Sequence, residues 1–199
     1  RLSATGVSRI EAVSFVNPKR VPQMAEAEIV MSKIKRPKGV TFAGLALNAK
    51  GAERAIDAGC DEVRYVVVSS ETFNRRNQGA SIDETLAGFS EIADKVTGAG
   101  LKLTATVAAA FGCPFEGEVA AESVINIANQ LVDGGASEIG LADTIGAARP
   151  NQVKNLFRKL FIAPTSKFTL GKQLTLFASR PSKSSCSVAR QFGSVSPFL

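Results

Sequence analysis

The chain has 199 residues, 45% hydrophobic and 21% charged, a composition typical of one ordinary globular domain. It contains no run of about eighteen apolar residues and no charged-then-apolar N-terminal pattern, so the sequence indicates neither a membrane span nor secretion. The net charge of +6 arises late in the chain: all 18 Asp and Glu lie at or before Asp143, and nine of the 24 Lys and Arg lie from Arg149 onward. Residues 1–148 therefore carry a net charge of −3, which argues against nucleic acid as a partner of the main body.

A strand over residues 10–16 is predicted first, because Ile10, Val13 and Phe15 are β-branched or aromatic. Glu11 lies within it, and a carboxylate on a buried strand costs free energy unless a cation or hydrogen-bond donors meet it. Glu11 is therefore a candidate site residue, although a salt bridge to a neighbour would explain it equally well. Beyond the strand, prolines on both sides of Lys19 and Arg20 restrict the backbone and present two cations to a phosphate or carboxylate.

Helices and strands then alternate. The predicted helices span residues 25–34, 51–58, 82–98 and 122–132, and the predicted strands span 40–47, 62–68, 101–107 and 138–142. Glycines follow the helices and a strand begins soon after each, which indicates βαβ units and a parallel sheet. No Gly-x-Gly-x-x-Gly or Walker loop opens any helix, so a barrel is favoured over a nucleotide-binding sheet. The polar stretch 73–79 is predicted to be a functional loop.

Polar residues gather at the predicted strand ends, where a barrel keeps its chemistry: Asn48, Ser69, Ser70, Thr106, Asp143 and Thr144. Four of them have a structural alternative. Asp143 and Thr144 could simply cap the next helix, because both residue types are good caps. The serines are more typical of backbone-bonding turns than of nucleophiles, since the chain has no His to activate them. Cys60, Cys113 and Cys186 lack metal-ligand spacing, which predicts free thiols in a reducing compartment.

The segment SFVNPKRVPQM at residues 14–24 resembles the signature of the 3-hydroxy-3-methylglutaryl-CoA lyases. Four further stretches resemble that family: 47–51, 70–77, 111–117 and 141–146. The resemblance covers about residues 3–157 and implies an α/β fold, a partial (β/α)8 TIM barrel with strands two to six of eight. It predicts a lyase domain at residues 1–160, followed by a basic tail at 161–199 that the family does not match. The Ser-, Lys- and Arg-rich composition of that tail predicts disorder.

The resemblance implies a metal-dependent lyase that cleaves 3-hydroxy-3-methylglutaryl-CoA to acetyl-CoA and acetoacetate. Mg2+ or Mn2+ would hold the substrate oxygens while a base removes the hydroxyl proton and the acetyl-CoA enolate leaves. Glu11 and Asp143 would lie in the catalytic site beside the metal. The residues expected to bind substrate are Thr144, Asn48, Lys50, Lys19, Arg20 and Ser70, with Lys19 and Arg20 near the CoA phosphates.

The sequence also departs from the family pattern. Thr106 stands where the lyases usually carry an aromatic residue near the substrate, which leaves its role open. The family's metal-binding His-x-His pair, its Asn ligand and its reactive cysteine loop have no counterpart, and the chain contains no histidine. The chain alone is therefore expected to be inactive.

Two alternative functions stay open. One is a related acyl-CoA carbon–carbon lyase or synthase, and the other is a non-catalytic protein whose basic tail binds an acidic partner. The expected partners are an acyl-CoA substrate and, through unpaired sheet edges, further copies of the chain in a homo-oligomer; no membrane is expected. The resemblance places the protein in the cytoplasm of a bacterium or the mitochondrial matrix of a eukaryote.

Overall fold

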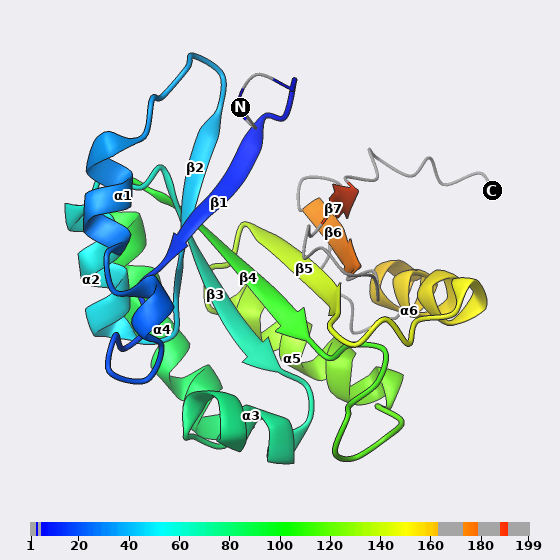
Figure 1. Cartoon of the computed structure of the whole chain (residues 1–199). Helices are drawn as coiled ribbons and strands as arrows, with labels where there is room; N and C mark the ends of the chain where they lie inside the picture. The colour runs from blue at the N-terminus through cyan, green and yellow to red at the C-terminus, as the bar shows by residue number, and fades with distance from the viewer. Residues whose placement is uncertain (1–2, 4, 163–172, 179–187, 191–199) are drawn as a thin grey trace. The chain divides into compact units, whose positions relative to one another are not determined.

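The computed structural model describes residue 3, residues 5–162, and the segments 173–178 and 188–190 (Figure 1). It divides into two compact units. The first unit comprises residues 1–66 and 88–104, and the second comprises 67–87 and 105–199. Strands β3 (Glu62–Val68) and β4 (Lys102–Ala108) and helix α4 (Ile82–Gly98) pass from one unit to the other. No helix in the described residues is long and apolar enough to cross a membrane.

The first unit is built on parallel strands with two short helices beside them. Besides its parts of β3, β4 and α4, it contains β1 (Arg9–Ser14), the 3-10 turn η2 (Pro22–Met24), α1 (Ala27–Lys33), β2 (Thr41–Ala46) and α2 (Ala49–Asp57). β1 pairs with β2, and β2 with β3, both in parallel. Glu11 pairs with Ala43 but Val13 pairs with Gly44, so β1 carries a bulge at Ala12.

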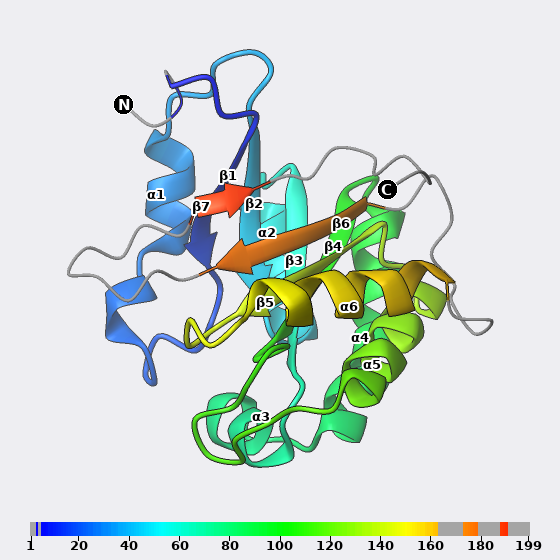
Figure 2. The ribbon, with the colours of Figure 1, turned by 90° about the vertical axis from the view of Figure 1, so that its right-hand side faces the viewer.

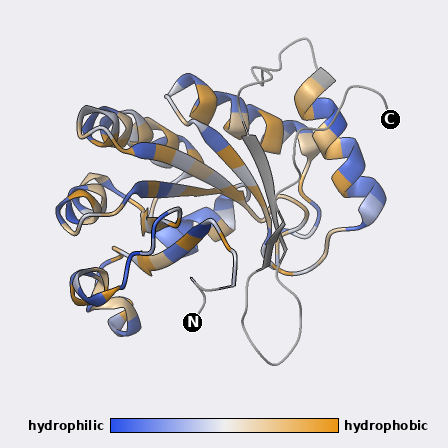
Figure 3. Ribbon diagram, turned by 90° about the horizontal axis from the view of Figure 1, so that it is seen from above, coloured by the Kyte–Doolittle hydropathy of each residue, from blue (hydrophilic) through white to orange (hydrophobic). Residues whose placement is uncertain are grey.

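The core of the first unit packs tightly where β1 leaves the sheet. Phe15 is buried, and a Cβ added to Gly44 would lie 2.6 Å from Phe15 Cε2 and 2.8 Å from Cys60 Sγ. Only glycine fits there, because no real Cβ tolerates such contacts. Tyr65 of β3 packs on Phe89 of α4 with ring centroids 5.2 Å apart, on the helix-covered side of the sheet. Figure 3 shows both hydrophobic and hydrophilic residues around the helices, as expected for helices with one buried and one exposed face.

The second unit holds the remaining parts of β3, β4 and α4 and six helices and strands of its own. These are α3 (Glu71–Gln78), α5 (Ala121–Asp133), β5 (Glu138–Asp143), α6 (Pro150–Ile162), β6 (Gln173–Ala178) and β7 (Val188–Arg190). β5 pairs with β6 in parallel and β6 pairs with β7 in antiparallel. Figures 1 and 2 show α3 beyond the carboxyl end of β3, next to the loop that follows β4.

The predicted strands and long helices are confirmed with small shifts at their ends. The spans 62–68 and 82–98 coincide with β3 and α4, and 122–132 lies within α5. The predicted helix 25–34 shortens to α1, because Ala25 ends the preceding 3-10 turn and Glu26 is the N-cap of α1.

The prediction of a loop at residues 73–79 is wrong, because this segment forms most of α3. The Ser70 side chain accepts a hydrogen bond from the Phe73 amide at the start of the helix, and Gly79 ends the helix in the left-handed conformation at φ 78°. One polar residue of the helix, Asn74, is fully buried. The helix was not predicted because its buried residue is the polar Asn74, so the segment lacks the apolar stripe that indicates a helix.

Three segments of the tail that the sequence predicted to be disordered lie among the described residues. Helix α6 continues to Ile162, and β6 and β7 are strands. β6 adds to β5 over six residue pairs, from Glu138–Gln173 to Asp143–Ala178. Residues 163–172, 179–187 and 191–199, and with them Cys186, lie outside the described residues.

Candidate active site

The predicted site residues fall into two sets, one in each unit. Glu11, Lys19, Arg20, Asn48 and Lys50 belong to the first unit. Ser70, Asp143 and Thr144 belong to the second. The expectation that Glu11 and Asp143 share one rim of a barrel concerns both units and stays a prediction.

Glu11 meets a buried cation, as its place in a strand requires. The nearest one is Arg64 of β3, whose Nη1 lies 3.6 Å from Glu11 Oε2. The Arg64 side chain is only 6% exposed, whereas that of Glu11 is 41% exposed. Desolvation by the surrounding protein raises the pKa of Glu11, Arg64 opposes that rise, and the negative charge of Glu62 adds to it. Glu11 is thus the accessible end of an otherwise buried group of charges.

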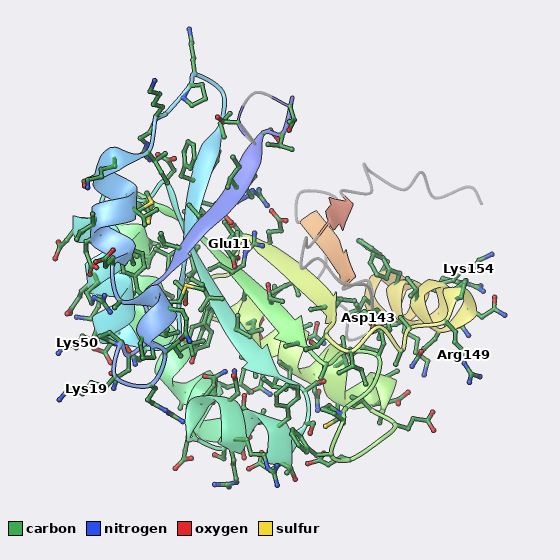
Figure 4. All side chains as sticks on the ribbon, in the orientation of Figure 1. Glu11, Lys19, Lys50, Asp143, Arg149 and Lys154 are labelled. Atoms are coloured by element: carbon green, nitrogen blue, oxygen red, sulfur yellow. The ribbon has the colours of Figure 1, made fainter. Side chains whose placement is uncertain are left out.

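Further along β1 and β2, a pocket of about 400 Å³ collects basic side chains. It is lined by Phe15, Asn17, Pro18, Lys19, Asn48, Lys50, Gly51 and Arg54. Figure 4 shows Lys19 and Lys50 close together beyond the ends of these strands, although they come from different segments. Arg20, which the sequence paired with Lys19, is exposed and does not line the pocket. Two exposed lysines, Lys19 and Lys50, therefore line this pocket.

The loop on one side of this pocket is held by Asn17 and Arg54. Asn17 Oδ1 accepts a hydrogen bond from the Lys19 amide at 2.9 Å, which fixes the turn that carries the lysine. Arg54 of α2 donates to the carbonyl oxygens of Phe15 and Val16 at 3.4 and 3.3 Å and pairs with Glu28 at 2.6 Å. Arg54 thus serves mainly to hold the backbone, and Lys19 and Lys50 are the two exposed lysines that line the pocket.

The opposite side of the pocket is the start of α2. Asn48 is the N-cap of this helix, and its Oδ1 accepts a hydrogen bond from the Gly51 amide at 2.8 Å. A Cβ on Gly51 would lie 2.9 Å from the Phe15 carbonyl oxygen, so glycine allows the helix and the β1 exit to approach closely. The positive end of the helix dipole adds to the charge of Lys50. The role of Asn48 shown by the structure is to cap and orient this helix.

In the second unit, Asp143 orders the loop between β5 and α6. Its two carboxylate oxygens accept hydrogen bonds from the amides of Ala147 at 2.8 Å and Ala148 at 3.1 Å. It does not cap α6, which begins at Pro150. The Thr144 hydroxyl oxygen accepts a hydrogen bond from the Ala109 amide at 2.8 Å. Ala109 is the one described non-glycine residue with positive φ, 55°, so this bond holds a strained turn after β4.

Ser69 and Ser70 bond to the backbone, as their structural alternative predicted. The Ser69 hydroxyl contacts the carbonyl oxygens of Ala108 and Ala109 at 3.0 Å. The Ser70 hydroxyl caps α3 and lies 2.8 Å from Cys113 Sγ. Cys113 Sγ in turn accepts from the amides of Phe115 and Glu116 at 3.3 and 3.4 Å, so Cys113 is a structural residue of its loop.

The two cysteines that the structure describes, Cys60 and Cys113, are free thiols, as expected. Burial raises the pKa of the Cys60 thiol to about 11, so it stays protonated at neutral pH. The Cys60 thiol is therefore a poor candidate for a metal ligand or a nucleophile.

Thr106 is a buried residue of β4 whose hydroxyl has no hydrogen-bond partner within the described part of the chain. An unsatisfied buried hydroxyl costs about 1–3 kcal/mol, so such a group is uncommon in a folded protein. Its position agrees with the prediction of a polar residue near the carboxyl end of a strand, and its role stays open.

The side chains present do not by themselves form a metal site. Among the described residues no group of three or more His, Cys, Asp or Glu could hold a metal ion. Glu11 is paired with a guanidinium, and both oxygens of Asp143 accept backbone hydrogen bonds. Mg2+ prefers nearly octahedral oxygen ligands, which these two carboxylates do not supply.

Sequence reasoning missed Arg64, Glu62 and Arg54. A signal for the first two was present, because Glu62 and Arg64 alternate with Val63 and Tyr65 in β3. That period of two indicates one polar and one apolar face, in contrast to the nearly continuous apolar run of β2. Arg54 gave no signal, since a basic residue on an exposed helix is common.

Comparison with known families places these features in context. The HMGL-like family profile matches residues 1–169, beyond the predicted domain end at residue 160. Hydroxymethylglutaryl-CoA lyase from Pseudomonas mevalonii is 40% identical over 156 residues, which is 78% of this chain and 52% of that protein. The mitochondrial enzyme of Bos taurus is 39% identical over 78% of this chain and 48% of its own length. (R)-citramalyl-CoA lyase from Chloroflexus aurantiacus is 43% identical over 80% of this chain and 54% of that protein.

Solved structures show the same relationship. The HMG-CoA lyase of Bacillus subtilis superimposes with a TM-score of 0.81 and 38% identity, over 88% of this chain and 58% of that one. An HMG-CoA lyase solved in complex with coenzyme A and 3-methylmalate gives a TM-score of 0.78 at 38% identity, over 87% of this chain and 56% of that one. The predicted fold class, α/β with part of a (β/α)8 barrel, is confirmed. The chain spans about half the length of the curated relatives it matches.

Proposed function

The chain belongs to the HMGL-like family, and on that premise we propose that it is part of a lyase that cleaves 3-hydroxy-3-methylglutaryl-CoA to acetyl-CoA and acetoacetate. The observation that carries the proposal is the extent of the family match. Residues 1–169 include Glu11, the basic pocket and the Asp143-Thr144 segment, so the match covers every candidate site residue.

The basic pocket supports an acyl-CoA as the substrate class. Coenzyme A carries several phosphate charges, and Lys19 and Lys50 offer two exposed ammonium groups at one pocket. A volume of about 400 Å³ lies in the range of small-molecule sites. We propose that Lys19 and Lys50 bind the phosphates of coenzyme A. Arg20 is not assigned to this contact, because it does not line the pocket.

The reaction breaks one carbon–carbon bond. The hydroxyl of the substrate loses its proton to a base, the carbon that bore it becomes the ketone of acetoacetate, and the bonding electrons leave with the acetyl-CoA enolate, which then takes up a proton. In this chain Glu11 would accept a hydrogen bond from a substrate or water hydroxyl at the accessible end of the charged group. Asp143 would hold the β5–α6 loop in shape, and Thr144 would present its side chain to the substrate.

The resemblance implies a divalent metal, Mg2+ or Mn2+, which would supply stabilisation of the developing oxyanion. Because the described carboxylates do not fit such an ion, its ligands would have to come from residues other than Glu11 and Asp143. The proton transfer and the bond cleavage are assigned to no metal ion.

A related acyl-CoA lyase is the second candidate function. The observation that favours it is the 43% identity to (R)-citramalyl-CoA lyase, a value similar to those of the hydroxymethylglutaryl-CoA lyases. Both names denote lyases acting on a CoA thioester, so the coenzyme pocket would serve either. Relatives occur in bacteria and in mitochondria, and we propose one of these two settings for this protein.

The test is to incubate the purified 199-residue chain with 3-hydroxy-3-methylglutaryl-CoA and Mg2+ and to measure acetoacetate. The control is a fusion of the chain to the family segments that carry the His-x-His pair and the Asn ligand. We expect turnover by the fusion and at least about a thousandfold less by the chain alone, because transition-state stabilisation of several kcal/mol is lost. Comparable turnover by the short chain would contradict the proposed dependence on those segments. If the fusion cleaved citramalyl-CoA faster than 3-hydroxy-3-methylglutaryl-CoA, the result would support the second candidate function, a related acyl-CoA lyase.

A further inference from the structure

Strand β3 places two opposite charges on one face of the sheet. Glu62 and Arg64 are two residues apart, so both side chains leave the same side of the strand. The side chain of Glu62 is fully buried and that of Arg64 is 6% exposed. Burying a charge costs free energy unless it is paired and hydrogen-bonded, so the contacts of Glu62 and Arg64 show how these two charges are stabilised.

The contacts form one connected group of charges. Glu62 Oε1 accepts hydrogen bonds from Arg64 Nη2 at 3.0 Å and from the Thr104 hydroxyl at 2.8 Å. Thr104 Oγ1 also accepts a hydrogen bond from Arg64 Nε at 3.2 Å. Glu62 Oε2 lies 3.2 Å from Arg9 Nε in an ion pair without hydrogen-bond geometry. These bonds fix the plane of the Arg64 guanidinium from two sides.

With that plane fixed, Arg64 Nη1 has a defined position, 3.6 Å from Glu11 Oε2. Glu11 is the most exposed member of the group, at 41%, compared with 24% for Arg9. It is therefore the one that a ligand would meet first. Because a guanidinium is planar and rigid, fixing its plane also fixes where its positive charge lies relative to the Glu11 carboxylate.

We infer that Arg64 is a positioning residue, which aims the Glu11 carboxylate at the ligand through their ion pair, with Thr104 and Glu62 fixing Arg64 in turn. The inference rests on the proposed function for the identity of the ligand, but the geometry of the charged group does not depend on it. Neither the sequence motifs nor the family resemblance pointed to Arg64.

The charges around Glu11 oppose one another. Arg64 and Glu62 face it from β3, Arg9 lies on its own strand, and β2 offers no titratable side chain. Desolvation and Glu62 both raise the pKa of Glu11, and Arg64 alone of these lowers it. Removing Arg64 therefore favours the protonated acid, and removing the charge of Glu62 favours the carboxylate.

The experiment is a carbon-13 titration of the Glu11 carboxyl in the full chain, assigned by comparison with Glu11→Gln. In Arg64→Met we expect the Glu11 pKa to rise by about one unit, the lower end of the effect of an adjacent arginine. In Glu62→Gln we expect it to fall. Arg36→Met is the matched control, because Arg36 pairs with Asp61 of the same unit, and the Glu11 pKa should stay unchanged.

Thr104→Val tests positioning separately from charge. It removes the hydroxyl that holds Arg64 Nε but alters no charge, so the Glu11 side chain should populate several χ1 rotamers, seen as averaged three-bond couplings, where the parent chain shows one. This variant also carries the test if Arg64→Met does not fold. A Glu11 pKa that is unchanged in folded Arg64→Met, or a single Glu11 rotamer in Thr104→Val, would overturn the inference. Neither measurement needs turnover, so failure of the lyase proposal would be seen separately.

Discussion

Lys19 and Lys50 lie far apart in sequence yet line one pocket, so their joint removal tests a property that neither segment has alone. We expect Lys19→Ala plus Lys50→Ala to weaken coenzyme A binding by about tenfold or more. A hydrogen bond to a charged group contributes about 1.5–3 kcal/mol and tenfold corresponds to about 1.4 kcal/mol. Isothermal titration calorimetry with coenzyme A measures the change.

The matched control for the lysines is Arg20→Ala, which removes a neighbouring exposed cation outside the pocket lining. The dissociation constant of this variant for coenzyme A should stay within about twofold of that of the unmodified chain, since a single exposed charge contributes little to binding free energy. Equal effects of both changes would indicate a general electrostatic attraction rather than a phosphate site.

Glu116 gives the second unit a pH-dependent contact. Its carboxylate accepts a hydrogen bond from the Thr72 amide at 2.6 Å, and hydrogen bonds from the Thr72 side chain and from this amide hold the pKa of Glu116 below its ordinary value. The contact therefore stabilises the loop fully above the ordinary Glu pKa of about 4.3 and is lost as the pH falls through the lowered value. We expect the Thr72 amide resonance to shift in that acidic range. The step should vanish in Glu116→Gln and persist in Glu118→Gln, an exposed neighbour.

At the scale of elements, α3 depends on the buried side chain of Asn74. Its Nδ2 donates to the carbonyls of Ala80 and Ser81 and to Thr85 Oγ1, and its Oδ1 accepts from the Val68 amide at 3.0 Å. Asn74→Ala leaves several of these groups unsatisfied, and we expect it to lower the free energy of unfolding by about 2–4 kcal/mol.

Asn77→Ala is the matched control for Asn74, because Asn77 lies on the exposed side of the same helix. It should change the free energy of unfolding by less than about 0.5 kcal/mol in urea denaturation. A similar loss in both variants would show that the amide network does not hold α3 in place.

The elements that sequence predicted well share a simple origin. α4 has apolar residues at helical spacing, Ile82, Leu86 and Phe89, and β3 lies between a glycine stop and a pair of serines. α3 was missed because one buried amide replaces an apolar stripe, and single buried polar residues leave no periodic signal. In the site, the basic loop and the strand-end residues were found from composition and resemblance. Which cations face the pocket depends on contacts between segments distant in sequence, and no local pattern carries that information.

At the scale of the whole molecule, β1 has one neighbour, β2, in the strand order of the described residues. Such an edge presents unpaired amides and carbonyls to other chains. We expect the purified chain to associate, with a mass from light scattering that rises above 20.9 kDa with concentration and falls again on dilution. A constant monomer mass across that range would contradict the expected homo-oligomer.

The charged pair on β3 also bears on how the sheet assembles. In the native alignment Glu62 pairs with Ala43 and Arg64 with Leu45. A slip of one residue would send both charges to the helix-covered side and bring Val63 and Tyr65 among the remaining charges. Four charged groups would lose their partners together, at a cost far above that of a slipped apolar strand. Whatever the pair adds to the stability of the finished fold, it penalises misaligned pairing of β3 with β2 and so makes the native alignment of the sheet specific.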